Sequence, residues 1–382
     1  MEQFYIDNKK FNFRIKRSKN FEKIIKINSS PRNYELEIIH KSISASINKA
    51  IKTTEKPVLL IDSNIYKIYG SKILKRNVLI YKFNAKESNK NLIECIKFTN
   101  FLEKNNINKS STVIVIGGGI VQDVGAFSCS IYKRGIKWIY FPTTLLSMTD
   151  SCIGGKTALN YRNIKNLYAL FSSPHHVILN TQFLSTLSKK DILSGLGESL
   201  KLSIIGGDRS LKTFSSNIDK AIALDRESIS KIIFNSILIK KSVIEKDEFE
   251  INERKSLNYG HSLGNAIEPM SKFYIPHGTA ITLGLLVENK IAVTSFGLSK
   301  GSDRLILDLA KKLILPRFIK KMSELNFSSI NKYLINDKKT KGKILKISVP
   351  TKIGRISFCK LTLNNTSIKT IKNSVKLLIN EL

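Results

Sequence analysis

The sequence is poor in cysteine and histidine and has no long apolar run. Its four cysteines (Cys95, Cys129, Cys152 and Cys359) are scattered over 382 residues without a CxxC pair. This excludes a disulfide framework and indicates a reducing, cytoplasmic compartment. No run of about 18 apolar residues occurs, so no transmembrane helix is expected. The N-terminus lacks the basic and apolar regions of a signal peptide.

Acidic residues are also scarce, with 30 Asp and Glu against 63 Lys and Arg, for a net charge of +33. The lysines are spread along the whole chain and are not interleaved with aromatic residues, so no nucleic-acid partner is expected. Heavy use of Lys, Ile, Asn and Ser is typical of an AT-rich genome. The charge should still attract small anionic substrates.

The length predicts two domains. Apolar runs at 58–62, 78–81, 112–116, 138–141 and 177–180 predict strands, and helical spacing at 91–104 and 121–131 predicts helices between them. Strands that alternate with helices predict an α/β fold with a Rossmann-like parallel sheet. We assign residues 1–187 to this domain, with an N-terminal extension that carries a strand near residues 11–15.

From residue 188 the pattern changes, and residues 188–382 are assigned to a mostly α-helical domain. Long amphipathic segments are expected at 211–246, 258–270, 279–295 and 303–324. A short strand is expected at 344–349.

Two glycine-rich turns follow predicted strands. The first, Gly117-Gly118-Gly119, precedes a predicted helix, where a pyrophosphate could approach the backbone. A tight turn without a ligand is the alternative. Asp62, at the end of an earlier strand, could bind a ribose or simply end the strand. The second turn runs from Asp150 to Lys156, and Lys165-Asn166 follows; these side chains suit an anion or decorate the surface.

One glutamate and two histidines form a candidate metal set. Glu198 lies in a glycine-rich helical segment, His261 begins a helical pattern, and His277 stands between Pro276 and Gly278. Two imidazoles and a carboxylate are a three-ligand set that leaves a position open for chemistry. Structural histidines and a Glu198–Lys201 ion pair are the alternatives.

The ordered segments together resemble the 3-dehydroquinate synthase family, within the sugar-phosphate cyclase group, over roughly residues 56–355. The segments are GGGIVQDVGAF (117–127), YKRG (132–135), FPTTLLSMTDSCIGGKTALN (141–160), IKNL (164–167), GLGESLK (195–201), LNYGHSLGNAIE (257–268) and HGTA (277–280).

The resemblance implies a dehydroquinate synthase-like fold and a homodimer that uses NAD and a divalent metal, zinc or cobalt. The implied metal ligands are Glu198, His261 and His277. The implied NAD contacts are Asp62, Asn64, Glu87, Lys90, Gly117, Gly118, Gly119, Asp123, Thr143, Thr144, Lys165, Phe183 and Thr186. The implied catalytic and substrate residues are Asp150, Lys156, Asn166, Lys201, Lys240, Arg254, Asn258 and Asn265, with Lys338 or Lys339 near the phosphate and Arg134 reaching a neighbouring subunit.

The implied reaction converts 3-deoxy-D-arabino-heptulosonate 7-phosphate into 3-dehydroquinate and phosphate, a lyase step of the shikimate pathway and aromatic amino acid biosynthesis. Two residues depart from the family pattern: Asn265 replaces a histidine, and Gln122 a small residue. Asn265 leaves open another cyclase, such as a 2-epi-5-epi-valiolone or 2-deoxy-scyllo-inosose synthase. An NAD-dependent polyol dehydrogenase would not need the anion-binding residues. A catalytically inactive binding protein would not need the intact metal set.

Overall fold

The computed structural model describes residues 2–14, 23–73, 78–162, 164–335 and 339–382. The chain divides into two compact units, the sheet unit (Arg17–Leu187) and the helical unit (Met1–Lys16 with Ser188–Leu382). The first sixteen residues, expected in the first domain, therefore pack with the helical unit. The reason is strand pairing: β1 (Glu2–Ile6) pairs in parallel with β14 (Arg355–Thr362), and β2 (Lys9–Phe13) pairs with β1.

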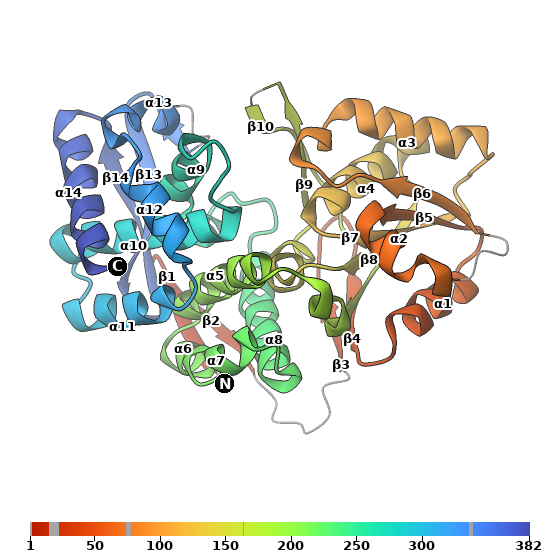
Figure 1. Cartoon of the computed structure of the whole chain (residues 1–382), viewed down its shortest axis with the longest axis horizontal. Coiled ribbons are helices and arrows are strands. Elements are labelled where there is room, and N and C mark those ends of the chain that lie inside the picture. The colour runs from red at the N-terminus through yellow and green to blue at the C-terminus, as the bar shows by residue number, and fades with distance from the viewer. Residues whose placement is uncertain (1, 15–22, 74–77, 163, 336–338) are drawn as a thin grey trace. The chain divides into compact units, whose positions relative to one another are not determined.

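The sheet unit contains a seven-stranded sheet in the order β3-β4-β11-β8-β7-β5-β6, parallel except between β3 and β4 (Figure 1). Every residue of β7 is buried, as expected where helices cover both faces. The predicted Rossmann-like α/β class is thus confirmed. The strands are β3 (Lys23–Ile27), β4 (Tyr34–Ile39), β5 (Pro57–Asp62), β6 (Leu79–Phe83), β7 (Thr112–Gly117), β8 (Lys137–Pro142) and β11 (His176–Asn180). The helices are α1 (Ile43–Thr53), α2 (Ser63–Tyr69), α3 (Leu92–Lys104) and α4 (Gly119–Ile131).

The strand order reverses between β5 and β7, which places a switch point there. From β5 the chain moves outward to β6, whereas β7, β8 and β11 follow in the other direction. Ligands of such sheets bind at the carboxyl ends of the strands beside this point. Asp62 ends β5 and Gly117 ends β7, so the first glycine-rich turn lies at the expected edge.

Residues 156–171, treated as loops in the sequence, form a separate antiparallel hairpin of β9 (Lys156–Tyr161) and β10 (Ile164–Phe171). The β9 strand of the hairpin packs against α3 and α4 (Figure 1). Lys156, Lys165 and Asn166 are therefore carried by paired strands.

The helical unit is organised around α10 (His277–Ser295), in which every residue from Gly278 to Ala292 is buried. A helix buried on all sides must lie at the centre of its unit, and α10 contacts α5, α9, α11 and α14. The single amphipathic segment predicted at 211–246 is instead divided among three helices, α6, α7 and α8. The other helices are α5 (Lys189–Ile205), α6 (Asp208–Ser215), α7 (Ile218–Ile222), α8 (Arg226–Ile244), α9 (His261–Met270), α11 (Lys300–Lys311), α12 (Pro316–Ser323), α13 (Asn331–Leu334) and α14 (Asn365–Glu381).

A five-stranded sheet in the order β12-β13-β14-β1-β2 completes the helical unit. The strand expected at 344–349 is the start of β13 (Ile344–Lys352), which pairs with β14 and with β12 (Thr340–Lys341). In the described parts of the chain, no helix is long and apolar enough to cross a membrane. All four cysteines are free, and three of them are buried.

Candidate active site

Three helices of the helical unit bring the predicted metal set together. Glu198 lies in the middle of α5, and His261 and His277 are the first residues of α9 and α10. The Nε2 atoms of both imidazoles lie 3.7 Å from Glu198 Oε1. One donor atom from each residue fits within a common spacing of 4.8 Å. The sequence therefore identified three residues that converge.

Glycines allow these helices to approach so closely. A Cβ atom at Gly278 would collide with the carbonyl oxygen of Ser194 on α5. A Cβ atom at Gly284 would likewise collide with the carbonyl oxygen of Gly260, which precedes α9. Close backbone contact on two sides of α10 thus fixes the position of His277 relative to Glu198 and His261.

Glu198 is buried, with 1% of its surface exposed. The Lys201 ammonium lies 2.5 Å from its Oε2, so the Glu198–Lys201 ion pair is formed beside the three converging candidate ligands. The pair engages one carboxylate oxygen, and the other faces the imidazoles. Burial is the main cause that holds the pKa of His261 well below its usual value, and the positive charge of Lys201 is the second. The ring is therefore neutral near pH 7.

These donors fit a divalent ion of the zinc or cobalt type. Donor atoms bound at about 2.1 Å in a tetrahedral arrangement lie about 3.4 Å apart. The nitrogen-to-oxygen distances of 3.7 Å are close to that spacing. A neutral imidazole is also the form that binds a metal.

Three carboxylates of the helical unit that contact predicted site residues, or the first turn of α9, were missed in the sequence. Glu268 Oε2 lies 3.2 Å from His277 Nδ1. Glu288, fully buried, accepts hydrogen bonds from the backbone N–H groups of Gly260 at 2.6 Å and Leu263 at 3.3 Å, which fixes the first turn of α9. Burial raises the pKa of Glu288 to about 7. Glu250 Oε1 accepts a hydrogen bond of 2.7 Å from Asn258 Nδ2.

The other predicted residues of the helical unit lie on several elements. Lys240 (α8) and Arg254 are 6% and 1% exposed, whereas Asn265, on the second turn of α9, is exposed. Asp247 accepts hydrogen bonds from the backbone N–H groups of residues 251, 252 and 254, which fixes the loop that carries Arg254. Lys339 is among the charges that lower the pKa of His261. Lys338 lies outside the described residues.

At the first glycine-rich turn of the sheet unit, Thr143 N–H donates to the carbonyl oxygen of Gly117 at 3.1 Å. A Cβ atom at Gly118 would come within 2.9 Å of Thr144 Cγ2, so the neighbouring turns are in close contact. The N-terminus of α4 begins at Gly119. These residues come together as predicted for a pyrophosphate, and their ligand remains a prediction.

Asp62 has a structural role as well as the predicted one. Its Oδ1 accepts a hydrogen bond of 2.8 Å from Asn64 N–H and caps α2. Burial raises the pKa of Asp62, and the backbone hydrogen bonds lower it. Phe183 is buried, and its ring centroid lies 5.9 Å from that of Tyr69. The exposed Thr186 donates a hydrogen bond from Oγ1 to the carbonyl oxygen of Phe183.

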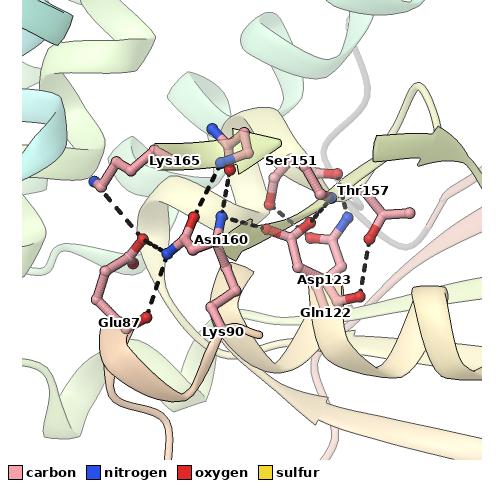
Figure 2. Close-up of polar contacts among 10 residues, drawn as sticks. Glu87, Lys90, Gln122, Asp123, Ser151, Thr157, Asn160 and Lys165 are labelled. Carbon is pink, nitrogen blue, oxygen red and sulfur yellow. Dashed lines mark hydrogen bonds and ion pairs between the residues drawn. The ribbon is translucent and has the colours of Figure 1, made fainter. Parts of the chain in front are cut away.

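Lys90, Asp123 and Asn166 form one contact group, of which the Lys90–Asp123 pair is seen in Figure 2; Lys90 is buried, Asp123 is partly buried and Asn166 is exposed. Lys90 Nζ lies 2.9 Å from Asp123 Oδ2 and donates to Asn166 Oδ1 at 2.7 Å. Asp123 Oδ1 also accepts from Ala158 N–H on β9 at 3.2 Å. Burial raises the pKa of Asp123, and the Lys90 ammonium opposes that rise. A predicted substrate residue, Asn166, thus contacts a predicted cofactor residue, Lys90, which is paired with another, Asp123.

Asn160, which was not predicted, connects the same group to Glu87 (Figure 2). Its Nδ2 donates to Glu87 Oε1 at 2.8 Å, and its Oδ1 accepts from Asn166 N–H at 3.0 Å. Its own N–H donates to the carbonyl oxygen of Lys90 at 2.7 Å. Lys165 Nζ lies 3.7 Å from Glu87 Oε1. An asparagine at the end of a strand gives no signal in a single sequence.

Gln122, the unusual residue beside Asp123, has a definite role. Its Nε2 donates to the carbonyl oxygen of Ser151, and Ser151 Oγ donates to its Oε1, both at 2.7 Å (Figure 2). These two hydrogen bonds attach the turn that contains Asp150 and Ser151 to helix α4. Lys156 begins β9 nearby in the sequence. Arg134 is exposed in a turn with a left-handed φ of 62°, which is strained for a non-glycine residue.

Comparison with known proteins covers the same elements. The 3-dehydroquinate synthase N-terminal model matches residues 80–194, and the C-terminal model of that enzyme matches residues 195–340. A 3-dehydroquinate synthase of Pelagibacter ubique is 36% identical over 355 residues, which cover 89% of this chain and 96% of the relative.

Solved structures of sugar-phosphate cyclases share the fold. A 2-epi-5-epi-valiolone synthase of Streptomyces hygroscopicus, solved with NAD⁺ and Zn²⁺, has a TM-score of 0.80 at 19% identity and covers 97% of this chain and 100% of its own. A 2-deoxy-scyllo-inosose synthase with carbaglucose-6-phosphate, NAD⁺ and Co²⁺ has a TM-score of 0.79 at 22% identity, covering 93% and 99%. Two family models that together match more than half of the chain, and a relative similar over nearly its whole length, place this chain in the 3-dehydroquinate synthase family.

Proposed function

We propose that the chain converts 3-deoxy-D-arabino-heptulosonate 7-phosphate into 3-dehydroquinate and phosphate, with NAD and a divalent metal. The observation that carries the proposal is the convergence of Glu198, His261 and His277 in a chain with family similarity over nearly its full length. A bound divalent ion would stabilise alkoxide and enolate charge as a Lewis acid, and NAD would supply reversible oxidation of a substrate alcohol.

Residues of the helical unit bind the metal and the substrate carboxylate. Glu198, His261 and His277 hold the ion. Lys240 and Arg254, both nearly fully buried, provide cations whose attraction for a carboxylate is strengthened by the low local dielectric. Asn258 donates hydrogen bonds to substrate hydroxyls, and Glu250 orients its amide. Lys339 neutralises phosphate charge.

Residues of the sheet unit bind and orient the cofactor. The glycine turn at 117–119 allows the pyrophosphate to approach the backbone at the N-terminus of α4. Asp62 and Glu87 accept hydrogen bonds from hydroxyl groups, as the family resemblance implies. Lys156 and Asn166 act on the substrate, and the Lys90–Asp123 pair holds Asn166 in place.

The test is incubation of metal-loaded protein and NAD with three substrates: the heptulosonate phosphate, sedoheptulose 7-phosphate and glucose 6-phosphate. Phosphate release from the first alone, without net NADH, is the expected result. Release only from a substrate that lacks a carboxylate would overturn the proposal in favour of another cyclase. Net NADH accumulation would indicate a polyol dehydrogenase.

Asn265 is the observation that favours the second candidate, another sugar-phosphate cyclase. An asparagine can donate a hydrogen bond but cannot carry charge or shuttle a proton near neutrality. The buried cations Lys240 and Arg254 favour the first candidate, because the other two sugar phosphates have no carboxylate for them to bind. N265H should preserve or raise turnover of the heptulosonate phosphate. A large loss would indicate that Asn265 serves a different substrate.

We also propose a cytoplasmic homodimer in which Arg134 acts on the neighbouring subunit. The strained and exposed turn at Lys133 and Arg134, with φ of 51° and 62°, supports this role, because such strain clusters at functional sites. The free cysteines agree with a reducing compartment. Mixing R134A with H261A subunits should restore part of the activity that each lacks alone, and sedimentation should give a dimer.

A further inference from the structure

We propose that Glu268 is a positioning residue that holds His277 with Nδ1 protonated and Nε2 directed to the metal position; this inference rests on the proposed metal-dependent function. The geometry points to it directly. Glu268 Oε2 lies 3.2 Å from His277 Nδ1, while Nε2 of the same ring lies 3.7 Å from Glu198 Oε1. An imidazole can donate from only one nitrogen and remain a neutral ligand through the other.

The two histidines are held by different means. His261 Nδ1 lies 3.3 Å from the backbone carbonyl oxygen of Tyr259, and its side chain is 17% exposed. His277 Nδ1 faces the Glu268 carboxylate, and its side chain is 39% exposed. A more exposed ring has fewer packing contacts to hold it. The Glu268 carboxylate therefore has a larger effect on the orientation of the His277 ring than the Tyr259 carbonyl oxygen has on that of His261.

Glu268 is itself well fixed. It is 7% exposed and lies seven residues after His261 on α9, so both side chains project from the same face of that helix. Its carbonyl oxygen accepts hydrogen bonds from Phe273 N–H at 2.9 Å and Ser271 Oγ at 2.8 Å, in the turn that leads to α10. One helix therefore supplies a ligand and the group that orients the next ligand.

The charge of Glu268 also matters. The ammonium of Lys201 offsets the charge of Glu198, and His277 stands at the positive N-terminal end of α10. A divalent ion would add two more positive charges at this position. The Glu268 carboxylate, 3.2 Å from His277 Nδ1, supplies the negative charge that opposes them.

Metal titration tests the proposal. We expect the dissociation constants of Zn²⁺ and Co²⁺, measured by chelator competition, to rise about 100-fold in E268A and about 10-fold in E268Q, which keeps an acceptor but loses the charge. E245Q is the matched control, because Glu245 is a partly buried carboxylate paired with Lys241 at 2.5 Å, and its affinity should equal that of the wild type. Affinities within about twofold of the wild type in both Glu268 variants would overturn the proposal.

A second measurement separates orientation from general damage. In ¹⁵N spectra of histidine-labelled apoprotein, His277 should carry its proton on Nδ1 in the wild type and in E268Q, and become a tautomer mixture in E268A. An unchanged tautomer in E268A would contradict the proposal even if the metal bound weakly. At saturating Co²⁺, E268A should regain most of its product formation. Wild-type protein that binds metal but forms no 3-dehydroquinate would refute the proposed function and leave the role of Glu268 intact.

Discussion

The predicted binding residues of the two units differ in their chemistry. In the sheet unit, the lysines of the predicted cofactor set are paired with carboxylates, Lys90 with Asp123 and Lys165 with Glu87, and amide side chains join the pairs. In the helical unit, two imidazoles face one carboxylate oxygen. A network of paired charges would orient a large ligand through many weak contacts. Three convergent donors would instead supply most of the binding energy of a single ion. Single substitutions should therefore have graded effects in the sheet unit and all-or-none effects in the helical unit.

The largest effect is expected from E198A or H261A. Loss of one of three ligands should abolish bound metal by elemental analysis and lower turnover on the order of 10³-fold or more. NAD affinity, which we propose depends on residues of the sheet unit, should be retained. One full equivalent of metal in both variants would refute the ligand assignment.

K90A should have the next largest effect. The substitution leaves the partly buried Asp123 without its cation and removes the bond to Asn166. Loss of charged hydrogen bonds of about 1.5–3 kcal/mol predicts a rise of roughly 10- to 100-fold in the NAD dissociation constant, measured by calorimetry, with unchanged metal content. K97A is the control, because Lys97 forms an exposed pair with Glu94 on α3. Equal NAD affinity in K90A and K97A would contradict this interpretation.

N160A tests the residue that the sequence did not reveal. Removing the amide separates Glu87 from Asn166, so the NAD dissociation constant and the substrate KM should both rise by about 10-fold, as expected for one or two hydrogen bonds. N105A, which alters an exposed amide at the end of α3, should change neither value. An effect on KM alone would show that Asn160 does not connect the two sets.

The smallest effect concerns stability. Burial raises the pKa of Glu288 from 4.5 to about 7, so the folded state holds this proton more tightly than the unfolded chain does. The resulting stabilisation is complete below about pH 4.5 and is lost as the pH rises through 7. E288Q does not titrate, so its unfolding free energy relative to the wild type should increase by at most roughly 3 kcal/mol between about pH 5 and 8 in urea unfolding.

Glu253 provides the control for that slope. The hydrogen bond from Lys9 lowers the pKa of Glu253, so its stabilisation is lost only as the pH falls below about 4.5. The unfolding free energy of E253Q should therefore differ from that of the wild type by a constant amount between about pH 5 and 8. If the unfolding free energies of E288Q and the wild type changed in parallel with pH, Glu288 would not titrate in this pH range.

The sequence predicted those features that depend on local pattern or on ordered motifs. The β7 run followed by Gly117 to Gly119, and the convergence of Glu198 with two histidines, are of this kind. Asn160, Glu268 and Glu288 could not be predicted, because each acts through partners brought together by tertiary packing. The placement of β1 and β2 also depends on the pairing of β1 with a strand about 350 residues later (Tyr5 with Arg355).

That pairing has a consequence for synthesis. Residues 17–187 are contiguous, so the sheet unit can fold as soon as they leave the ribosome. The β1–β2 hairpin must wait for β14, an interval of roughly 20 to 70 s at about 5–20 residues per second. Until then Phe4 and Phe11, fully buried in the folded chain, and an unpaired strand edge are open to chaperones and to aggregation. The helical unit is therefore completed by joining the first strands of the chain to nearly its last.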